Sequence, residues 1–403
     1  MNTEKMEQIN IKKLVPYANN SRTHSEEQIK QIQSSIREFG FINPVLIDSN
    51  FGIIAGHARV LAAKAEGMKE VPCVFVDHLT EAQKKAYILA DNKLALNAGW
   101  DEDMLKVEME ELKDMNFNLE LTGFDAGEIA ELLLGEPDEV TEDDFDIEPP
   151  AVPISKLGDV YQLGLHRLMC GDSTSSEDVK KLMDGKKARF VFTDPPWNVD
   201  YGADTKHPSW KPRQILNDHM STEDFGAFLY AAFAAMKEVS ERGCMTYIVM
   251  SAQEWGNMMN VLTRLDYHWS STIIWKKDSL VLSRKDYHTQ YEPIWYGWLA
   301  GDARLCPLED RKQTDVWEID RPKKSDDHPT MKPIELVVRA IKNSSLIGDT
   351  VLDLFGGSGT TLIAAEQTKR ACNMMELDPK YVDVIITRWE TLTGKKAVLL
   401  SDK

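Results

Sequence analysis

Residues 190–197 read FVFTDPPW, an apolar and β-prone run that ends in a carboxylate, two prolines and an indole ring. We predict a buried strand that places Asp194 at its carboxyl end, where open α/β sheets bind their ligands. Pro195 and Pro196 have a fixed φ and no N–H group, so the strand cannot continue and carbonyls there stay free to accept hydrogen bonds. With Trp197 beside them, these groups suit a planar base that carries an amino group. The alternative is a strand followed by an ordinary Pro-Pro turn.

A second stretch, residues 350–361, reads TVLDLFGGSGTT and predicts a strand, a glycine-rich turn and then a helix over 362–368. Such a turn lets the backbone pass close to a ligand at the N-terminus of the helix. The turn lacks the Gly-Lys-Ser/Thr ending of a P-loop, and Leu362 stands where a dinucleotide fingerprint has its third glycine. The next predicted strand, 371–375, ends at Glu376, where α/β nucleotide-binding folds hold ribose hydroxyls. The predicted ligand is a nucleoside without a pyrophosphate, and S-adenosylmethionine fits.

Five stretches within residues 153–400 resemble the motifs of amino-group (N6-adenine/N4-cytosine) DNA methyltransferases of the β arrangement, in which the catalytic motif precedes the cofactor motif. In chain order they are CGDS at 170–173, DPPW at 194–197, HPTMKP at 328–333, DLFGGSGTT at 353–361, and Glu376. The chain departs from the family at Leu354, where a proline usually follows the motif aspartate. The resemblance implies a Rossmann-like α/β domain that transfers a methyl group from S-adenosylmethionine to double-stranded DNA.

The resemblance also implies roles for single residues. Asp194 and the Pro195 carbonyl accept hydrogen bonds from the amino group of a flipped base, and Trp197 stacks on that base. Asp172 reaches the adenine end of the cofactor and Lys332 its methionine carboxylate, unless Lys332 is a surface lysine. The full predicted set comprises the catalytic residues Asp194, Pro195, Pro196 and Trp197, and the cofactor-binding residues Asp172, Thr330, Lys332, Asp353, Phe355, Gly356, Gly357, Ser358, Gly359, Thr360 and Glu376. No metal site is predicted.

The aspartate at position 194 favours adenine-N6 as the target, because this family more often has serine there for cytosine-N4. Cytosine-N4 methylation stays the nearest alternative, since both targets are exocyclic amino groups. Protein-glutamine methyltransferases usually begin the related motif with asparagine and place the cofactor loop first, so they fit less well. From another class, the chain could be a ParB-like DNA-binding regulator with a silent methyltransferase domain.

The N-terminal part resembles the ParB/sulfiredoxin-like domain that is fused to methyltransferases in phages and mobile elements. The resemblance rests on IAGHAR at 54–59 and ADNKLA at 90–95, which runs on to GWD at 99–101. Gly56, His57 and Arg59 at the start of a predicted helix form a candidate phosphate or nucleotide site. A purely structural role for Arg59 is an equal alternative. Partition proteins carry Glu-Arg-Arg at positions 57–59, so a CTP-hydrolysing clamp does not follow, and without a metal-ligand cluster we do not predict a nuclease.

Length and charge predict three parts: a ParB-like domain over 1–100, an acidic helical extension and linker over 101–150, and the methyltransferase domain over 151–403. Within 1–100, a helix is expected around Ile29, Ile32 and Ile36, with Gly40 as its C-terminal cap. Of the net charge of −18, residues 101–150 contribute −17, from 19 acidic and 2 basic side chains. We read the acidic part as a solvated spacer, with a DNA-mimicking arm as the alternative.

The five scattered cysteines lack a Cys-x-x-Cys pair, which favours reduced thiols in the cytoplasm of a bacterium or a phage-infected cell. No apolar run is long enough to span a membrane, and the first twelve residues lack the apolar segment of a secretion signal. A homodimer, a nucleotide ligand of the N-terminal domain and the recognition sequence are left open.

DNA contacts are expected from loops and basic residues of the C-terminal part. Residues 198–216 are predicted to form a mobile loop over the target pocket, and 300–325 to recognise DNA, with part of the selectivity delegated to the N-terminal domain. Between 255 and 324, basic residues interleave with tryptophans, as on a nucleic-acid surface, although most of the tryptophans are expected in the core. The tryptophans are Trp255, Trp269, Trp275, Trp295, Trp298 and Trp317, and the basic residues are Lys276, Lys277, Arg284, Lys285, Arg304, Arg311, Lys312, Arg321, Lys323 and Lys324.

Overall fold

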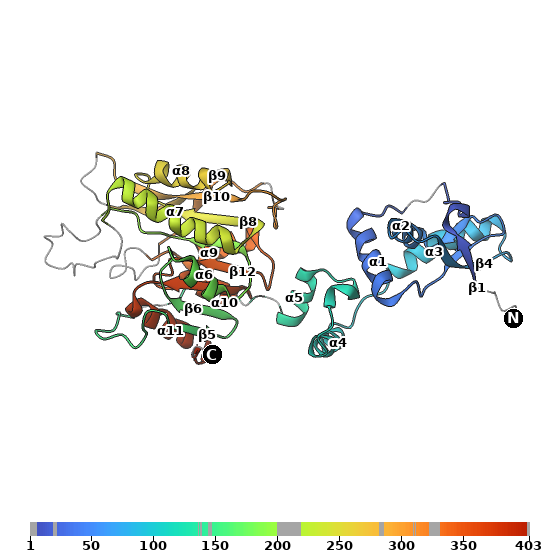
Figure 1. The fold of residues 1–403 in the computed structure, drawn as a ribbon, viewed down its shortest axis with the longest axis horizontal. Helices are drawn as coiled ribbons and strands as arrows, with labels where there is room; N and C mark the ends of the chain where they lie inside the picture. The colour runs from blue at the N-terminus through green and yellow to red at the C-terminus, as the bar shows by residue number, and fades with distance from the viewer. Residues whose placement is uncertain are drawn as a thin grey trace. The chain divides into compact units, whose positions relative to one another are not determined.

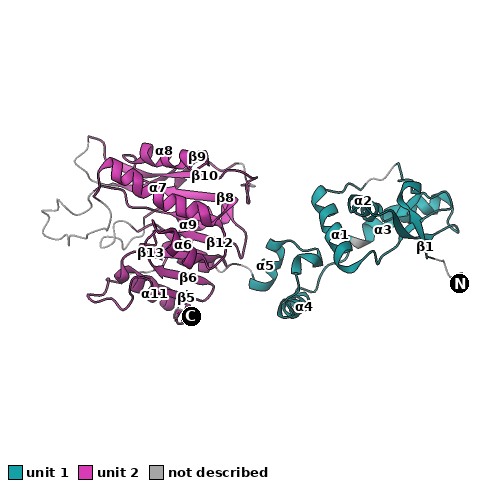
Figure 2. Cartoon of the chain, viewed as in Figure 1, with its two compact units in different colours: residues 1–135 teal, residues 136–403 magenta. Residues whose placement is uncertain are grey.

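The computed structural model describes residues 6–18, 22–135, 137, 139–143, 147–199, 219–281, 286–308, 310, 312–321 and 331–400. The chain forms two compact units, residues 1–135 and residues 136–403 (Figure 2). The helices of the acidic extension therefore belong to the first unit, and the remaining linker residues belong to the second.

The first unit contains a four-stranded sheet in the order β1-β4-β2-β3 (Figure 1). Its strands are β1 Met6–Asn10, β2 Val45–Ile47, β3 Ile53–Ala55 and β4 Glu70–Phe75. Its helices are α1 Glu26–Phe39, α2 His57–Ala65, α3 Glu81–Ala95, α4 Glu102–Asp114 and α5 Ala126–Leu134, with the short 3-10 turns η1 Ile11–Lys13 and η2 Leu119–Thr122. The predicted first helix is confirmed: the Ser25 hydroxyl caps its start, and Gly40 at φ 80° ends it.

The second unit is built on one ten-stranded sheet in the order β11-β9-β10-β8-β7-β12-β13-β6-β5-β14. The strands are β5 Val160–Leu163, β6 His166–Cys170, β7 Ala188–Thr193, β8 Ser240–Val249, β9 Tyr267–Val281, β10 Thr289–Leu299, β11 Val316–Glu318, β12 Thr350–Asp353, β13 Ala371–Glu376 and β14 Val398–Leu400. The central strands β8, β7, β12, β13 and β6 run parallel to one another. Their carboxyl ends therefore meet at one edge of the sheet.

Helices cover both faces of this sheet (Figure 1). On one face pack α6 Ser176–Met183, α7 Thr222–Val239 and α8 Trp255–Arg264, and on the other α9 Ile334–Ser344, α10 Thr360–Gln367 and α11 Pro379–Thr393. In β7, Val191 packs on the face covered by α6, α7 and α8, whereas Phe190 and Phe192 pack on the face covered by α9, α10 and α11, so consecutive residues at its centre are apolar. This layered α/β arrangement confirms the predicted fold class.

Part of the acidic linker packs against the second unit, which corrects the prediction of a solvated spacer. Two hydrogen bonds join Thr141 to the side chain of Gln367. The backbone amide of Thr141 donates to Gln367 Oε1 at 3.0 Å, and the backbone carbonyl of Thr141 accepts from Gln367 Nε2 at 3.0 Å. The Asp143 carboxylate accepts two bonds from the guanidinium of Arg388, at 2.6 and 2.7 Å. Arg388 is only 3% exposed, and a buried cation needs a partner, so Asp143 is held in place.

No helix among the residues that the structure describes combines the length and the apolar character needed to cross a membrane. Within the same ranges, no group of three or more His, Cys, Asp or Glu side chains could hold a metal ion.

Candidate active site

The sheet brings the two sequence motifs together. Strand β7, which ends just before Asp194, lies directly beside β12, which ends at Asp353. The Thr193 hydroxyl donates to Asp353 Oδ1 at 2.8 Å and so ties the ends of the two strands to each other. Next along the sheet, β13 ends at Glu376. The Asp-Pro-Pro-Trp corner and the glycine-rich turn, 160 residues apart, thus share one edge of the sheet.

Asp194 is held from two sides and still reaches the surface. The indole N–H of Trp197 donates to its Oδ1 at 3.0 Å, and Lys332 Nζ donates to its Oδ2 at 2.6 Å. The Asp194 side chain keeps 27% of its surface exposed. Burial raises the pKa of this carboxyl above its ordinary value, against the pull of Lys332 and with a further rise from Glu292. The result is an oriented acceptor that opens onto the carboxyl edge of the sheet.

Lys332 lies in a chain of four charged side chains. Its ammonium is 2.6 Å from Asp194 and 3.3 Å from Oε2 of Glu292, while Lys277 Nζ donates to Oε1 of Glu292 at 2.6 Å. Burial lowers the pKa of Lys332, but Asp194 and Glu292 outweigh burial and leave this pKa above its ordinary value. Lys332 is thus buried rather than on the surface, and its predicted contact with a methionine carboxylate stays a prediction.

Lys277 was expected among the DNA-facing basic residues, and the structure places it in this buried group instead. The sequence reasoning also missed Glu292, the one carboxylate within strand β10. A glutamate followed by the apolar run of residues 293–299 was the available signal, because buried carboxylates need partners.

The glycine-rich turn has the geometry of a backbone cradle. A Cβ atom at Gly356 would come within 2.8 Å of Met374, so only glycine fits where β12 passes β13. At Gly357, with φ 52°, a Cβ atom would meet nothing within 4 Å, so the turn borders open space. Gly359, with φ 88°, is the N-cap of α10. The turn therefore offers a bare peptide surface at the N-terminus of a helix.

Glu376 closes the cradle from the end of β13. Its Oε2 accepts from the Gly357 amide at 2.8 Å and its Oε1 from the Asp378 amide at 2.9 Å. Burial raises the pKa of the Glu376 carboxyl to about 7, although both amides favour the ionised form. Each carboxylate oxygen keeps a second lone pair, which a ribose hydroxyl could use.

Asp353 faces a similar environment at the end of β12. Besides Thr193, the Phe355 amide donates to its Oδ1 at 3.1 Å. Burial raises the pKa of the Asp353 carboxyl to about 7. Asp353 is 3% exposed, so in the described structure it acts as a brace between strands.

The other predicted cofactor residues lie around the same edge with defined partners. Asp172 follows β6, and its Oδ1 accepts from the amide and the hydroxyl of Thr174 at 2.9 and 2.8 Å. The Phe355 ring packs on Phe228 with their centroids 5.9 Å apart. Arg388 donates to the Ser358 carbonyl at 2.9 Å and to the Thr360 hydroxyl at 3.2 Å, on the side of the turn reached by Asp143.

Some predictions fall wholly or partly outside the described residues. Thr330 and His328 lie there, as do most of the loop 198–216 and residues 322–325 of the predicted recognition segment. Of the six tryptophans, Trp275, Trp295 and Trp317 are buried as expected, whereas Trp269 is 49% exposed.

In the first unit, the candidate phosphate site is built of side chains with structural partners. Gly56 has φ 102° and is the N-cap of α2. His57 Nε2 accepts from the Tyr17 amide at 3.2 Å, and burial lowers the pKa of its imidazole, which suits an acceptor nitrogen. Arg59 donates to the Asn43 carbonyl at 2.8 Å. A nucleotide at this site stays a prediction.

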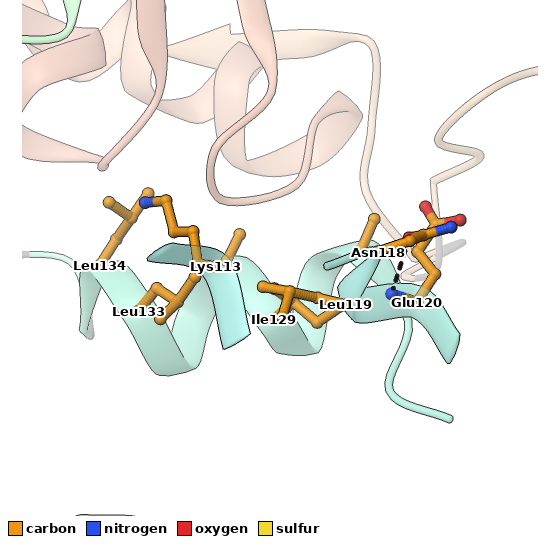
Figure 3. A pocket seen from close by; sticks show the side chains of 9 residues that line it. Lys113, Asn118, Leu119, Glu120, Ile129, Leu133 and Leu134 are labelled. Atoms are coloured by element: carbon orange, nitrogen blue, oxygen red, sulfur yellow. Dashed lines mark hydrogen bonds between the residues drawn. The ribbon is translucent and has the colours of Figure 1, made fainter. Parts of the chain in front are cut away.

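A separate hollow of about 330 Å³ lies between α4, η2 and α5 of the first unit (Figure 3). Apolar side chains from α5 line much of it, together with polar groups at its ends, and no residue of the predicted sites takes part. Its lining residues are Lys113, Asn118, Leu119, Glu120, Ala126, Ile129, Ala130, Leu133 and Leu134.

Comparisons with known proteins show the same class of protein that the sequence motifs resemble. The family model described as DNA methylase matches residues 188–387, ParB N-terminal domain matches 1–93, and ParB-methyltransferase HTH domain matches 103–157. The chain therefore carries an N6/N4 amino-group DNA methylase domain together with a ParB N-terminal domain. S-adenosylmethionine is the methyl donor of this family, as the sequence analysis predicted. The helix-turn-helix match covers a region that we had expected to be an acidic helical extension and linker.

Individual relatives resemble different parts of the chain. ParB-like nuclease domain-containing protein YnaK of Escherichia coli (strain K12) is 51% identical over 75 residues, which cover 19% of this chain and 86% of that protein. DNA adenine methyltransferase YhdJ of the same organism is 25% identical over 251 residues, 54% of this chain and 81% of that protein. Among solved structures, the M1.HpyAVI-SAM complex superposes with a TM-score of 0.41 at 19% identity, over 55% of this chain and 98% of that one.

Proposed function

We propose that this chain is a site-specific DNA adenine-N6 methyltransferase. The observation that supports this proposal most is the setting of Asp194: an oriented carboxylate, partly exposed, on the strand next to the glycine-rich turn. Its two oxygens are held by Trp197 and Lys332, and each retains a lone pair for the amino group of a flipped base. The Pro195 carbonyl supplies the second acceptor.

The residues around Asp194 would orient the amino nitrogen of the flipped base for its attack on the methyl carbon. Two acceptors in fixed positions orient its two N–H bonds and direct its lone pair away from the carboxylate. Lys332 lies over the Trp197 ring at 5.0 Å from the centroid, and we propose that the base stacks on the opposite face. As the nitrogen gains the methyl carbon, it loses a proton, which the Asp194 carboxylate accepts or relays.

The cradle at residues 353–376 fits the nucleoside of S-adenosylmethionine, which supplies a methyl group on a sulfonium. The open space at Gly357 leaves room for a flat ligand against the backbone. We propose that Glu376 accepts hydrogen bonds from the ribose hydroxyls. Asp172, which follows the neighbouring strand β6, would contact the adenine. Phe355 and the peptide groups of 356–359 would line the nucleoside.

Adenine is preferred over cytosine because residue 194 is an aspartate, which in this family accompanies adenine more often. To test this, unmethylated DNA is incubated with the protein and the cofactor, and its nucleosides are analysed by mass spectrometry. We expect N6-methyladenine, and N4-methylcytosine in its place would refute the choice of base. Asp194→Ala is expected to abolish transfer while the calorimetric affinity for S-adenosylmethionine is retained. A wild-type protein that modifies neither base would instead support the regulator with a silent methylase domain.

A further inference from the structure

Three buried charged side chains from separate segments form a chain of ion pairs that ends at the candidate catalytic carboxylate of Asp194. The four groups follow one another with alternating sign: Lys277 of β9, Glu292 of β10, Lys332 before α9, and Asp194 after β7. The Lys277 and Glu292 side chains are 8% and 10% exposed, and Lys332 is 9% exposed. Charges are rarely buried without a function or a strong structural demand, because each ion loses its hydration.

We propose that Glu292 is a positioning residue for methyl transfer, which fixes the Asp194 carboxylate through Lys332. The inference rests on the proposed function, since it takes Asp194 as the acceptor of the base amino group. Lys332 alone could swing toward either carboxylate or toward solvent. With Glu292 3.3 Å away on one side and Asp194 2.6 Å away on the other, its ammonium lies between two carboxylates and donates to the nearer, Asp194. Lys277, at 2.6 Å, holds Glu292 from behind.

This arrangement also affects how easily the Asp194 carboxyl ionises. In the described residues, the charged groups that face Asp194 are Lys332, Glu292 and Asp353, with Lys277 one step behind Glu292. Glu292 repels a negative charge on Asp194, and Lys277 weakens that repulsion by neutralising Glu292. Replacing Glu292 with glutamine should therefore make Asp194 easier to ionise, whereas replacing Lys277 with methionine should make it harder.

Two variants of the full chain, Glu292→Gln and Lys277→Met, test the inference because their expected shifts have opposite signs. In single-turnover methyl transfer, the rate should fall on the acid side as Asp194 becomes protonated. We expect the midpoint of this fall to move to lower pH in Glu292→Gln and to higher pH in Lys277→Met. The plateau rate of Glu292→Gln should drop by about 10- to 100-fold, the scale of a small misplacement of a reacting group. A purely structural role would lower the melting temperatures but leave both midpoints unchanged, which overturns the inference.

A second readout is independent of activity. The Trp197 indole donates to Asp194, so the ¹⁹F resonance of 5-fluorotryptophan at position 197 should titrate with this carboxyl; Trp197→Phe assigns the signal. We expect its midpoint to shift in the same two directions in the two variants. If these shifts occur but the wild-type protein methylates no DNA, the proposed function is wrong and the coupling of Glu292 to Asp194 holds. If the wild-type protein methylates DNA and neither midpoint moves, the proposed function holds and the inference is wrong.

Discussion

At the scale of single residues, three carboxyl groups lie at the edge of the sheet that bears the candidate site. Burial raises the pKa of Asp194, Asp353 and Glu376. Among the described residues, only Asp194 has a lysine partner, whereas Asp353 and Glu376 accept from neutral donors. The three groups therefore differ in role: Asp194 stays close to a cation, and the other two approach neutrality near pH 7.

The raised pKa of Asp353 predicts that the folded chain is less stable when this carboxyl is ionised. The pKa of this carboxyl is about 7 in the folded chain and near 4 when unfolded, so wild-type stability falls as pH rises from about 4 to 7. Asp353→Asn keeps the Oδ1 acceptor for Thr193 and Phe355 but carries no charge. In urea unfolding at pH 8 we expect the variant to be more stable by about 1 kcal/mol. The difference should vanish near pH 4; an equal difference at both pH values would contradict this explanation.

Cofactor affinity should also depend on pH, through Glu376. Its pKa is about 7 without ligand, and the ionised carboxylate is the better acceptor for ribose hydroxyls. Calorimetry should therefore show weaker binding of S-adenosylmethionine at pH 6 than at pH 8. In Glu376→Gln we expect binding about tenfold weaker at pH 8, with little further change at pH 6. A variant that retains the wild-type pH dependence would exclude Glu376 as its source.

At the scale of elements, parallel strands explain why distant motifs become neighbours. Strands β7, β12 and β13 are adjacent and parallel, so the residues that follow each of them gather at one edge. Helix α11 then stabilises the glycine-rich turn, because its Arg388 donates hydrogen bonds to the Ser358 carbonyl and the Thr360 hydroxyl. Asp143 of the linker completes this support through its two bonds to Arg388.

Asp143→Asn should therefore affect a turn that Asp143 does not itself touch. The variant replaces the carboxylate that accepts two bonds from the buried Arg388 guanidinium with a neutral amide, and we expect a loss of about 1–3 kcal/mol in the free energy of unfolding. Affinity for S-adenosylmethionine should fall as well, because the Ser358 carbonyl is less firmly held. Glu139→Gln, which removes a charge from an exposed position of the same linker, is the matched control and should change neither quantity. Equal effects of the two variants would indicate a general influence of linker charge.

Local sequence predicted these elements well and their long-range contacts poorly. FVFTDPPW and TVLDLFGGSGTT predicted their strands and the helix after the turn, because β-propensity, proline and glycine act within a few residues. Lys277 could not be separated from the basic residues around it, since its partner Glu292 lies on another strand. The docking of Asp143 was missed for the same reason, as Arg388 follows 245 residues later. Composition alone predicted a solvated linker.

At the scale of the whole molecule, the boundary between the two units falls at residue 135, ahead of the docked linker residues. Thr141 is hydrogen-bonded to Gln367 and Asp143 to Arg388, so we expect both linker residues to stabilise the second unit. We predict that a fragment of residues 136–403 folds independently, and that residues 151–403 melt several degrees lower, since 1 kcal/mol corresponds to about 2–4 °C for a domain of this size. Thermal unfolding followed by circular dichroism compares the two.

The same fragments test where sequence selectivity resides. If part of it is delegated to the first unit, residues 136–403 should methylate DNA at more kinds of site than the full chain does. Sequencing of treated DNA with modified bases identified gives the comparison. Identical site preferences for fragment and full chain would assign recognition to the second unit alone.

The bond between Asp143 and Arg388 has a consequence for how such a chain can be recombined. If the first unit is exchanged for another domain, in nature or by design, the second unit keeps this bond only if the crossover falls upstream of Thr141. A junction placed at the proline pair Pro149-Pro150, where composition alone would suggest a hinge, would remove the two bonds between Asp143 and the buried Arg388. Donor and acceptor genes that join at residue 136 would keep the methylase half intact.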